Sequence, residues 1–473
     1  MRFLTLFLLV FSGLPAFAQS GRTSTGNAPD ALTQSVAVVP TVKQLFDETN
    51  GYVRAKGVEF DAKKIPFSER LLAEAKAGQR QLAAKNAAIA GTRANLAGDE
   101  FYYLGMLHWI AENLDSTVNA LRKFIAFDGV DPVRRQTARS IVVVALAKQG
   151  RLDEAEPVLA EYLKNEPTKL TERARMEGEL AKAYQAKKDA ARMAPHAEAA
   201  YNASKSLLKE ASSRSRGLDE ILDAGMLVFE AYRDLGEQKK AEASLEEMRV
   251  TAAAFESPTF YYYAVDQKIK YLTETGRKAQ ALLYYQSAVA TSAKDFKAKE
   301  SGEDIVLRLK KRDRQYKLLG EPAPELVSID KWFPGEQKTL ADMKGKVVLL
   351  DFWATWCGPC FDAYPSLIEW QQDFKADGLE ILGVTRYYGD INGAPAAMPV
   401  EIEFLKQFKE KEKLPYDFLV ARDQASQILY GATALPTAVL IDRKGVIRYI
   451  ESGTSSTRIS EMREMILKLL AEK

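Results

Sequence analysis

A short segment with two prolines divides the chain into two parts that follow different secondary-structure patterns. Pro322 and Pro324 lie within residues 320–324, and closely spaced prolines cannot continue a helix. From Val42 to about Arg314 the sequence is rich in helix-forming residues, whereas after Pro324 short apolar runs alternate with helical stretches. The 473-residue chain therefore predicts an all-α part followed by an α/β part with a mixed central sheet.

One local pattern recurs along the helical part. A helix with aromatic and small residues meets a short polar turn, and an Ala-rich helix follows. The turns lie at residues 112–115, 150–153, 236–239 and 276–279. The first two turns are 38 residues apart and the last two are 40 residues apart, somewhat more than the about 34 of tetratricopeptide repeats. A single hairpin cannot bury its apolar face, so neighbours must stack, and residues 41–316 resemble a degenerate tetratricopeptide-like helical solenoid.

The first residues have the features of a targeting signal. A basic residue precedes an apolar run that starts at Phe3, and small residues flank Phe17, as a signal peptidase requires. We expect residues 1–18 to be a signal peptide cleaved before Gln19, and residues 19–40 to be a flexible segment. An uncleaved membrane anchor is the alternative, but it needs ~20 apolar residues. The predicted location is the bacterial periplasm, where disulfides persist.

Charge and composition exclude two classes of function. The chain has 66 basic and 64 acidic residues, which gives a net charge of +2, whereas a nucleic-acid-binding protein usually shows a strong basic excess. Only two cysteines and two histidines are present. A zinc site takes three or four soft ligands, so we expect neither a metal site nor a nucleic-acid partner.

After the two prolines, strands and helices alternate. The predicted strands are residues 347–352, 380–384, 417–420, 437–441 and 446–451. The predicted helices are about 359–375, then 400–411, 424–430 and 457–470. The first strand is an unbroken apolar run except for Asp351, as is typical of a central strand buried on both faces. This order predicts a mixed sheet with helices on both faces.

Both cysteines of the chain lie three residues apart, at Cys357 and Cys360. A disulfide between them closes a loop so small that it restricts the unfolded chain very little, so a redox role explains the spacing better than a structural one. The pair follows a strand and begins a helix, where unpaired amides and the helix dipole favour a thiolate at Cys357. A haem-attachment motif needs a histidine next, and Phe361 stands there instead.

Residues 321–473 resemble the TlpA/ResA branch of exported thiol-disulfide oxidoreductases, which have a thioredoxin-like fold. The resemblance covers about a third of the chain and leaves the helical part outside it. Five segments carry the resemblance: residues 320–324, 345–349, 352–357, 435–437 and 440–445.

The resemblance implies a role for each matching residue. Cys357 corresponds to the attacking cysteine and Cys360 to the resolving one. Pro436 is implied to be cis and, with Leu435, to offer a backbone edge to extended substrate; such bonds are uncommon. Trp356 is implied to pack near the site, with substrate contact as the functional alternative. No cofactor is implied.

One departure from the branch concerns the carboxylate that handles protons. The branch commonly carries a glutamate three residues after the second cysteine, and Ala363 stands there, beside Asp362. On the strand before the motif, this chain has Asp351, where thioredoxin keeps its buried aspartate. A buried carboxyl has a raised pKa and can exchange a proton with Cys360. We therefore expect Asp351 to be catalytic, with Asp362 as the competing candidate.

The sequence favours a reductase of protein disulfides. Gly358 and Pro359 between the cysteines are the dipeptide of thioredoxin, a strong reductant at about −270 mV, whereas the oxidant DsbA lies near about −120 mV. The expected partners are protein thiol or disulfide substrates, a membrane thiol-reductant donor, and a protein bound by the helical part. Two alternatives remain: a thiol reductase of cytochrome c maturation, or a tetratricopeptide-like adaptor with an accessory redox domain.

Two further segments carry weaker signals. The basic run at residues 308–317 is interpreted as the solvated face of a terminal helix or linker, with contact to acidic lipid headgroups as the alternative. Residues 385–399 form a long loop after a predicted parallel strand. Because ligands approach α/β sheets at the carboxyl ends of strands, this loop either frames the site or is a plain surface excursion.

Overall fold

The computed structural model describes residues 39–210 and 212–472. The predicted signal peptide and most of the predicted flexible segment therefore lie outside the described residues. No helix in the described ranges is long and apolar enough to cross a membrane.

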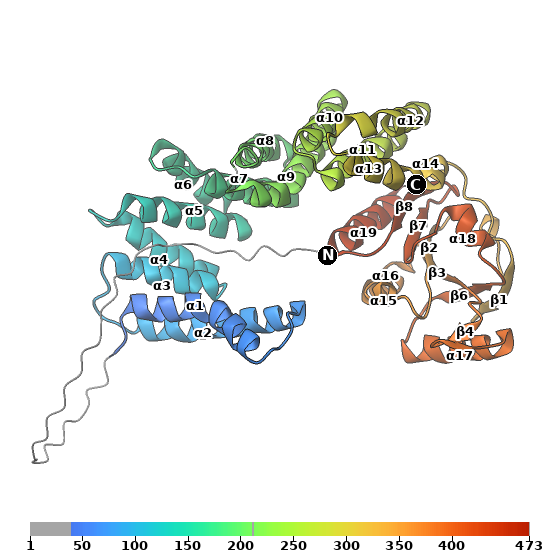
Figure 1. Cartoon of the computed structure of the whole chain (residues 1–473), viewed down its shortest axis with the longest axis horizontal. Helices are drawn as coiled ribbons and strands as arrows, with labels where there is room; N and C mark the ends of the chain where they lie inside the picture. The colour runs from blue at the N-terminus through green and yellow to red at the C-terminus, as the bar shows by residue number, and fades with distance from the viewer. Residues whose placement is uncertain (1–38, 211, 473) are drawn as a thin grey trace, which may run out of the picture.

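Fourteen α-helices precede the first strand within the part of the chain that the structure describes. They are α1 (Val42–Ala62), α2 (Glu69–Gly91), α3 (Asp99–Ile110), α4 (Leu114–Ala126), α5 (Pro132–Lys148), α6 (Leu152–Lys164), α7 (Leu170–Ala186), α8 (Ala190–Leu207), α9 (Arg214–Asp234), α10 (Gln238–Ala254), α11 (Pro258–Glu274), α12 (Lys278–Asp295), α13 (Lys299–Lys311) and α14 (Asp313–Leu318). Consecutive helices pack side by side in a curved row (Figure 1).

The turns between paired helices share one backbone geometry. Each contains a residue in the left-handed region, with φ between 57° and 75°: Glu112, Gly150, Lys188, Gly236 and Gly276. The amide after each of these residues donates to the carbonyl five positions earlier over 2.8–3.0 Å, which closes the helix in the manner of a Schellman motif. The four turns predicted from the sequence are confirmed. The tetratricopeptide-like label stays a prediction.

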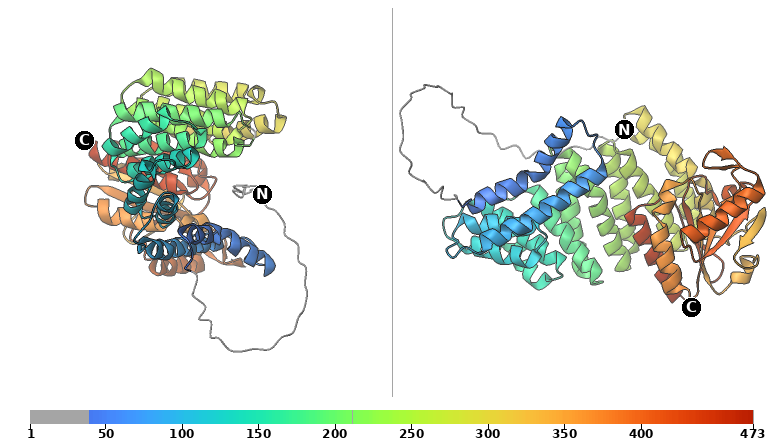
Figure 2. Two further views of the ribbon diagram at one scale, coloured as in Figure 1. Left: turned by 90° about the vertical axis from the view of Figure 1, so that its left-hand side faces the viewer. Right: turned by 90° about the horizontal axis from the view of Figure 1, so that it is seen from below.

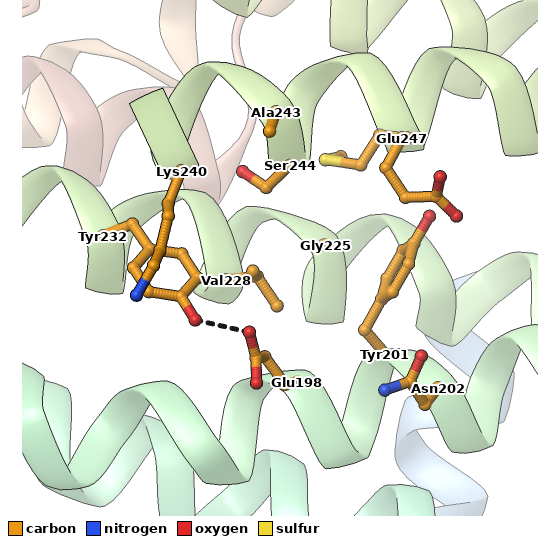
Figure 3. Close-up of a pocket in the computed structure, with 11 residues that line it drawn as sticks. Glu198, Tyr201, Asn202, Gly225, Val228, Tyr232, Lys240, Ala243, Ser244 and Glu247 are labelled. Atoms are coloured by element: carbon orange, nitrogen blue, oxygen red, sulfur yellow. Dashed lines mark hydrogen bonds between the residues drawn. The ribbon is translucent and has the colours of Figure 1, made fainter. Parts of the chain in front are cut away.

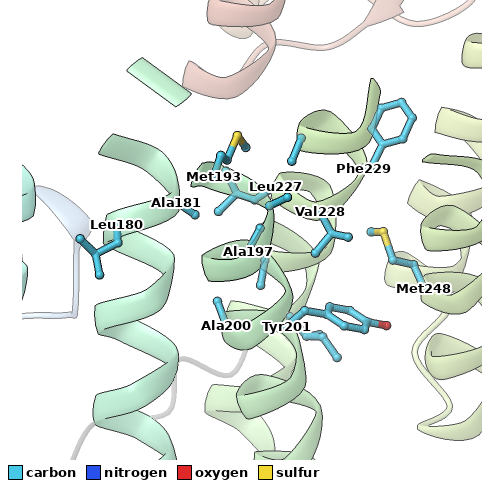
Figure 4. Packing of buried hydrophobic residues seen from close by; sticks show 14 of the residues in the cluster. Leu180, Ala181, Met193, Ala197, Ala200, Tyr201, Leu227, Val228, Phe229 and Met248 are labelled. Atoms are coloured by element: carbon cyan, nitrogen blue, oxygen red, sulfur yellow. The ribbon is translucent and has the colours of Figure 1, made fainter. Parts of the chain in front are cut away.

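Small residues let the helices of the row approach closely. Figure 4 shows Ala197 and Ala200 of α8 between the side chains of α7 and α9. On α9, a Cβ at Gly225 would lie 2.8 Å from the sulfur of Met248 on α10, so only glycine fits there without displacing that side chain. The apolar cluster of the row continues through α11 to α14.

The α/β part contains a six-stranded sheet in the order β1-β6-β3-β2-β7-β8. The strands are β1 (Ile329–Phe333), β2 (Val347–Phe352), β3 (Leu379–Arg386), β6 (Asp417–Ala421), β7 (Thr437–Ile441) and β8 (Ile447–Ser452). β2, β3 and β6 are parallel, and the other three strands pair antiparallel. The mixed sheet and the thioredoxin-like architecture are as expected, whereas the sequence missed the edge strand β1 and the short β4 (Asp390–Ile391) and β5 (Ala394–Pro395) hairpin.

Helices cover both faces of this sheet. They are α15 (Gly358–Phe361), α16 (Tyr364–Phe374), α17 (Met398–Lys411), α18 (Ala425–Tyr430) and α19 (Ser456–Ala471). Val347 and Leu349 of β2 face the cluster formed with α16, α17 and α19, and Val348 and Leu350 face the opposite cluster. The strand is buried along its whole length, which explains its almost unbroken apolar sequence.

The expectation of one helix over residues 359–375 is wrong. The structure has two segments, the four-residue α15 and the eleven-residue α16. Pro365 lies in the first turn of α16, a position where proline is tolerated because its missing N–H would have no helical partner. The break puts Asp362 and Ala363 between the two helices.

The interpretation of the basic run as a solvated face is also wrong at its centre. Arg312 is 9% exposed and donates to both carboxylate oxygens of Glu451 on β8, over 2.8 and 3.2 Å. Lys270 of α11 pairs with Glu451 as well and with Asp266 over 2.7 Å. These four residues, the ion cluster, join the helical part to the sheet, because buried charges are tolerated only when paired.

The two parts of the chain meet at α14. The α/β part lies at one end of the helical row, on the same side of it as α1 and α2 (Figures 1 and 2). Leu318 and Leu319 at the end of α14 pack into the apolar cluster beneath the sheet. The division of the chain into 41–316 and 321–473 stays a prediction, and this packing places the end of α14 with the sheet.

The ion cluster leads to a prediction about stability. Arg312→Met should destabilise the α/β part by about 3 kcal/mol, because removing one partner of a buried ion pair leaves the ion cluster with two carboxylates and one cation. Four of the five tryptophans lie after residue 330, so the urea midpoint of tryptophan fluorescence reports on this part. Arg308→Met is the control, since Arg308 is only half-buried and pairs with Asp304 within its own helix. Equal midpoints for the two variants would contradict the prediction.

Candidate active site

The two cysteines form a disulfide at the carboxyl end of β2. Cys357 and Cys360 are joined by an S–S bond of 2.09 Å, with 5.4 Å between their Cα atoms. Cys357 is the residue before α15. Both are buried, with 4% of Cys357 and 1% of Cys360 exposed. The pair therefore belongs to the apolar cluster that β2 forms with α16, α17 and α19, and it does not lie on an open loop.

The turn that presents Cys357 is held by backbone hydrogen bonds. The amide of Cys357 donates to the carbonyl of Ala354 over 3.1 Å, and that of Cys360 donates to the carbonyl of Cys357 over 3.0 Å. The expected dipole effect on Cys357 is smaller than for a continuous helix, because α15 has only four residues and the macrodipole sums over aligned peptide units.

Asp351 is a buried carboxyl on β2, as its sequence position predicts. It is 3% exposed, and its cross-strand neighbours are Gly383 of β3 and Ala438 of β7. These small neighbours leave the carboxyl without a cross-strand hydrogen-bond donor. Burial raises the pKa of Asp351 to about 7, because an apolar environment disfavours the charged form.

A small cavity connects Asp351 with other residues singled out from the sequence. Its volume is about 20 Å³, and Asp351, Ala363, Pro436 and Glu451 are among its lining residues. This volume is sufficient for about one water molecule. The cavity thus brings the predicted carboxyl and the predicted proline together.

Two tyrosines near Asp351 were not predicted from the sequence. The hydroxyls of Tyr364 and Tyr416 are buried and make no hydrogen bond with other described residues. Burial, followed by the nearby charge of Asp351, raises the pKa of both phenols well above the usual range, so they stay protonated. Neither position carries a motif, since only the tertiary packing places them beside the carboxyl.

The competing carboxylate lies elsewhere. Asp362 is exposed between α15 and α16, whereas Ala363 beside it is buried against the cavity. Of the two candidates, Asp351 is the buried one and Asp362 the exposed one, and the role of Asp351 in proton exchange with Cys360 stays a prediction.

The proline loop has the conformation that the resemblance implies. The Leu435–Pro436 peptide bond is cis. The carbonyl of Pro436 accepts a hydrogen bond of 2.7 Å from the amide of Gly453, just after β8. Leu435 is half-buried and packs against the cluster that contains both cysteines.

The tryptophans of the motif differ in environment. Trp356 is 60% exposed and meets Tyr388 edge-on at 5.3 Å between ring centroids. Tyr388 belongs to the predicted loop after β3. Its amide donates a hydrogen bond of 2.8 Å to the buried carboxylate of Glu401. The loop therefore reaches the redox motif. Trp353 is fully buried and stacks on Phe408, so its role is packing.

Comparisons with known proteins identify the α/β part. A family model described as Redoxin matches residues 318–466. The chain is 33% identical over 136 residues to the thiol-disulfide oxidoreductase ResA of Geobacillus kaustophilus, across 29% of this chain and 70% of that protein. It is 34% identical over 146 residues to ResA of Bacillus cereus, across 30% and 75%. The chain belongs to the ResA family of thiol-disulfide oxidoreductases.

Membership of the ResA family assigns the chemistry. The protein is a thiol-disulfide oxidoreductase, and the Cys357–Cys360 disulfide is its cysteine pair. A solved DsbE-like thiol:disulfide interchange protein from Chlorobium tepidum is 31% identical, with a TM-score of 0.26, across 32% of this chain and 98% of that one. The ResA relatives match about 30% of the chain, and the Redoxin match begins at residue 318.

The raised pKa of Asp351 leads to a prediction about stability and pH. In the unfolded chain its pKa is about 3.9, and in the folded chain about 7. Between these two pH values, the carboxyl of Asp351 is ionised in the unfolded chain but still protonated in the folded chain. The free energy of unfolding therefore falls as the pH rises through this range. The full loss, about 4 kcal/mol, is reached above pH ~7.

Asp351→Asn should remove this loss, so the variant should be more stable than the wild type at pH 8 and close to it at pH 4. The urea midpoint of tryptophan fluorescence for the oxidised protein measures the difference at each pH. Asp362→Asn is the matched control, because Asp362 is exposed. A wild-type advantage at pH 8 would show that Asp351 is not a buried, uncompensated carboxyl.

Proposed function

We propose that the protein is an exported reductase of protein disulfides that works through the Cys357/Cys360 dithiol. The observation that carries the proposal is the buried carboxyl of Asp351, which lines the cavity under Pro436 and has a pKa of about 7. A group with a pKa near the working pH can both accept and donate a proton. In each cycle of disulfide reduction, such a group accepts a proton from a thiol of the protein and later donates it to a departing substrate thiolate.

The proposed reaction has two exchange steps. The Cys357 thiolate attacks one sulfur of the substrate disulfide and forms a mixed disulfide, while the departing substrate thiolate takes up a proton. Asp351, by way of the cavity, accepts the proton of the Cys360 thiol. The Cys360 thiolate then attacks the Cys357 sulfur, and the second substrate sulfur leaves as a thiolate, which takes the proton from Asp351 and departs as a thiol. Two electrons pass to the substrate, and the protein is left with its disulfide.

The residues between the cysteines support the proposed direction of the reaction. Gly358 and Pro359 match the dipeptide of thioredoxin, and thioredoxin is a far stronger reductant than DsbA. Regeneration of the dithiol needs two electrons from a donor, for which we propose a membrane thiol reductant. Pro436, Leu435 and the exposed Trp356 are proposed to contact the substrate chain.

The helical part is proposed to bind a protein partner. A pocket of about 490 Å³ lies between α8, α9 and α10, and Figure 3 shows its floor at Gly225 and Val228. Tyr232, which donates to Glu198, and Tyr201 form two walls. Aromatic walls with charged rims suit an extended peptide segment, so we propose that a segment of the substrate protein binds here.

The proposal of export rests on residues 1–18, and the two alternative functions differ from the main proposal in the substrate or in the role of the redox domain. Residues 1–18 are proposed as the signal peptide and the periplasm as the location, a compartment in which disulfides form. A thiol reductase of cytochrome c maturation would use the same chemistry on a narrower substrate. An adaptor with an accessory redox domain is disfavoured by the intact constellation of Cys357, Cys360, Asp351 and Pro436.

Variants of the two cysteines test the proposed reaction. Cys360→Ser should accumulate mixed disulfides with periplasmic proteins, because the intermediate on Cys357 then has no resolving thiol. Cys357→Ser should capture none. Non-reducing gels followed by mass spectrometry measure the products, and capture of apocytochromes alone would favour the narrower function. Equal capture by the two variants would refute the assignment of roles.

The pocket in Figure 3 leads to a separate prediction. Ala243 is exposed and lines the pocket, so Ala243→Trp should fill it with little effect on folding. The variant should lower kcat/KM for a captured protein substrate by about tenfold, as expected when an aromatic-lined contact is lost. Turnover of a small model disulfide should stay unchanged. Ala254→Trp, at an exposed position outside the pocket, is the control, and a similar effect from both would exclude the pocket.

A further inference from the structure

Helix α14 places side chains from the helical part directly on the segment that carries Pro436. The Nε of Arg314 donates to the carbonyl of Leu429 over 2.8 Å, near the end of α18. Gln315, only 4% exposed, donates from Nε2 to the carbonyl of Gly431 over 2.9 Å and to the Oγ of Ser452 over 3.1 Å. Residues 429–437, the proline segment, are therefore held from outside their own sheet.

The contact at Gly431 is close as well as polar. A Cβ at this residue would lie 3.1 Å from the Cγ of Gln315 and 3.2 Å from the Cβ of Arg314. Gly431 also has a φ of 66°, which glycine adopts at no steric cost. Gly431, the first residue after α18, therefore packs closely against the side chains of α14, with little room for a larger residue.

Hydroxyl groups continue the path from Gln315 to the far side of Pro436. The Oγ of Ser452 lies 2.8 Å from the Oγ1 of Thr437, its cross-strand partner. Thr437 Oγ1 donates to the carbonyl of Ala434 over 2.6 Å. Each hydroxyl has one hydrogen, so Ser452 must donate to Thr437 and accept from Gln315. The path runs from Gln315 through Ser452 and Thr437 to Ala434, and it brackets Leu435 and Pro436.

The start of this path is fixed by the ion cluster. Arg312, just before α14, binds Glu451 with two hydrogen bonds and also donates to the carbonyl of Ile450 over 3.2 Å. Tyr316 on α14 donates to Asp266 of α11 over 2.6 Å. Gln315 therefore lies between two anchored residues, and its side chain has little freedom to leave Ser452.

We propose that Gln315 is a positioning residue for the substrate, through which the helical part holds the proline segment in its binding conformation. The inference rests on the proposed function, in which this segment contacts the substrate chain. A preformed binding edge loses less conformational freedom on association than a mobile one. The helical part then contributes to the binding of protein substrates in two ways. It holds the proline segment in place, and it binds a peptide segment at the pocket between α8, α9 and α10.

The test compares Gln315→Met with Lys317→Met in the full-length protein. Methionine keeps the length of glutamine but cannot donate to Ser452 or Gly431. Lys317 lies on the same helix, is exposed, and pairs only with Asp313 through its side chain. Gln315→Met should raise the KM for a protein disulfide by about fivefold, the effect of roughly one net hydrogen bond, with little change in kcat or in turnover of a small disulfide. Lys317→Met should match the wild type.

A double variant distinguishes positioning from a general structural effect. If Gln315 acts through Ser452, then Gln315→Met combined with Ser452→Ala should raise KM no more than the stronger single variant. Additive effects on KM would overturn the proposed path. An equal fall in the turnover of small and protein disulfides would also overturn it, because that pattern indicates damage to the redox centre.

Amide hydrogen exchange gives a readout that does not depend on activity. Gln315→Met should speed exchange across residues 429–437 relative to Lys317→Met, because local opening of the segment becomes easier. Unchanged exchange would overturn the inference. A wild-type protein that reduces no protein disulfide would refute the proposed function instead, and the exchange result would still decide whether Gln315 holds the segment.

Discussion

The structure depends on a carboxylate that is buried where two separate parts of the chain meet. Although burial by itself raises the pKa of Glu451, the charges of Arg312 and Lys270 outweigh that effect and lower it. The charge on this strand residue is therefore stabilised mainly by two cations from the helical part, with Arg458 of α19 as a third at 3.9 Å. Asp266 balances them, so that the ion cluster contains two charges of each sign. Such a cluster is weak evidence for high stability, but it fixes one relative placement of α11, α14 and β8.

That placement matters because β8 belongs to the redox site. Glu451 lines the same small cavity as Asp351 and Pro436, and it is two strands away from Asp351 in one row of the sheet, with Ala438 between them. The two carboxyls have opposite electrostatic environments. Paired cations hold Glu451 ionised, whereas burial without a partner raises the pKa of Asp351 to about 7. Of these two carboxyls, Asp351 is therefore the one that can hold a proton near neutral pH.

Much of the α/β part could be predicted from the sequence, because local pattern and tertiary environment agree there. The run at residues 347–352 is apolar on both faces, and it becomes a central strand with the same bounds. Gly431 ends α18, as its position predicts. The edge strand β1 was missed, since one strand at the border of a sheet needs no strong alternation. The predicted helix over residues 359–375 joins two helices, because the sequence does not show whether Pro365 kinks one continuous helix or begins a new one.

The sequence by itself determined the chemistry, since two cysteines three residues apart between a strand and a helix have few uses besides thiol-disulfide exchange. It also placed Asp351 on the buried strand. Only the tertiary structure decided what surrounds these groups: the hydroxyls of Tyr364 and Tyr416, the cavity that Asp351 shares with Pro436, and the path from Gln315. The physical reason is distance along the chain. Gln315 and Ser452 are 137 residues apart, and no local pattern encodes a hydrogen bond that forms only when two parts of the chain dock.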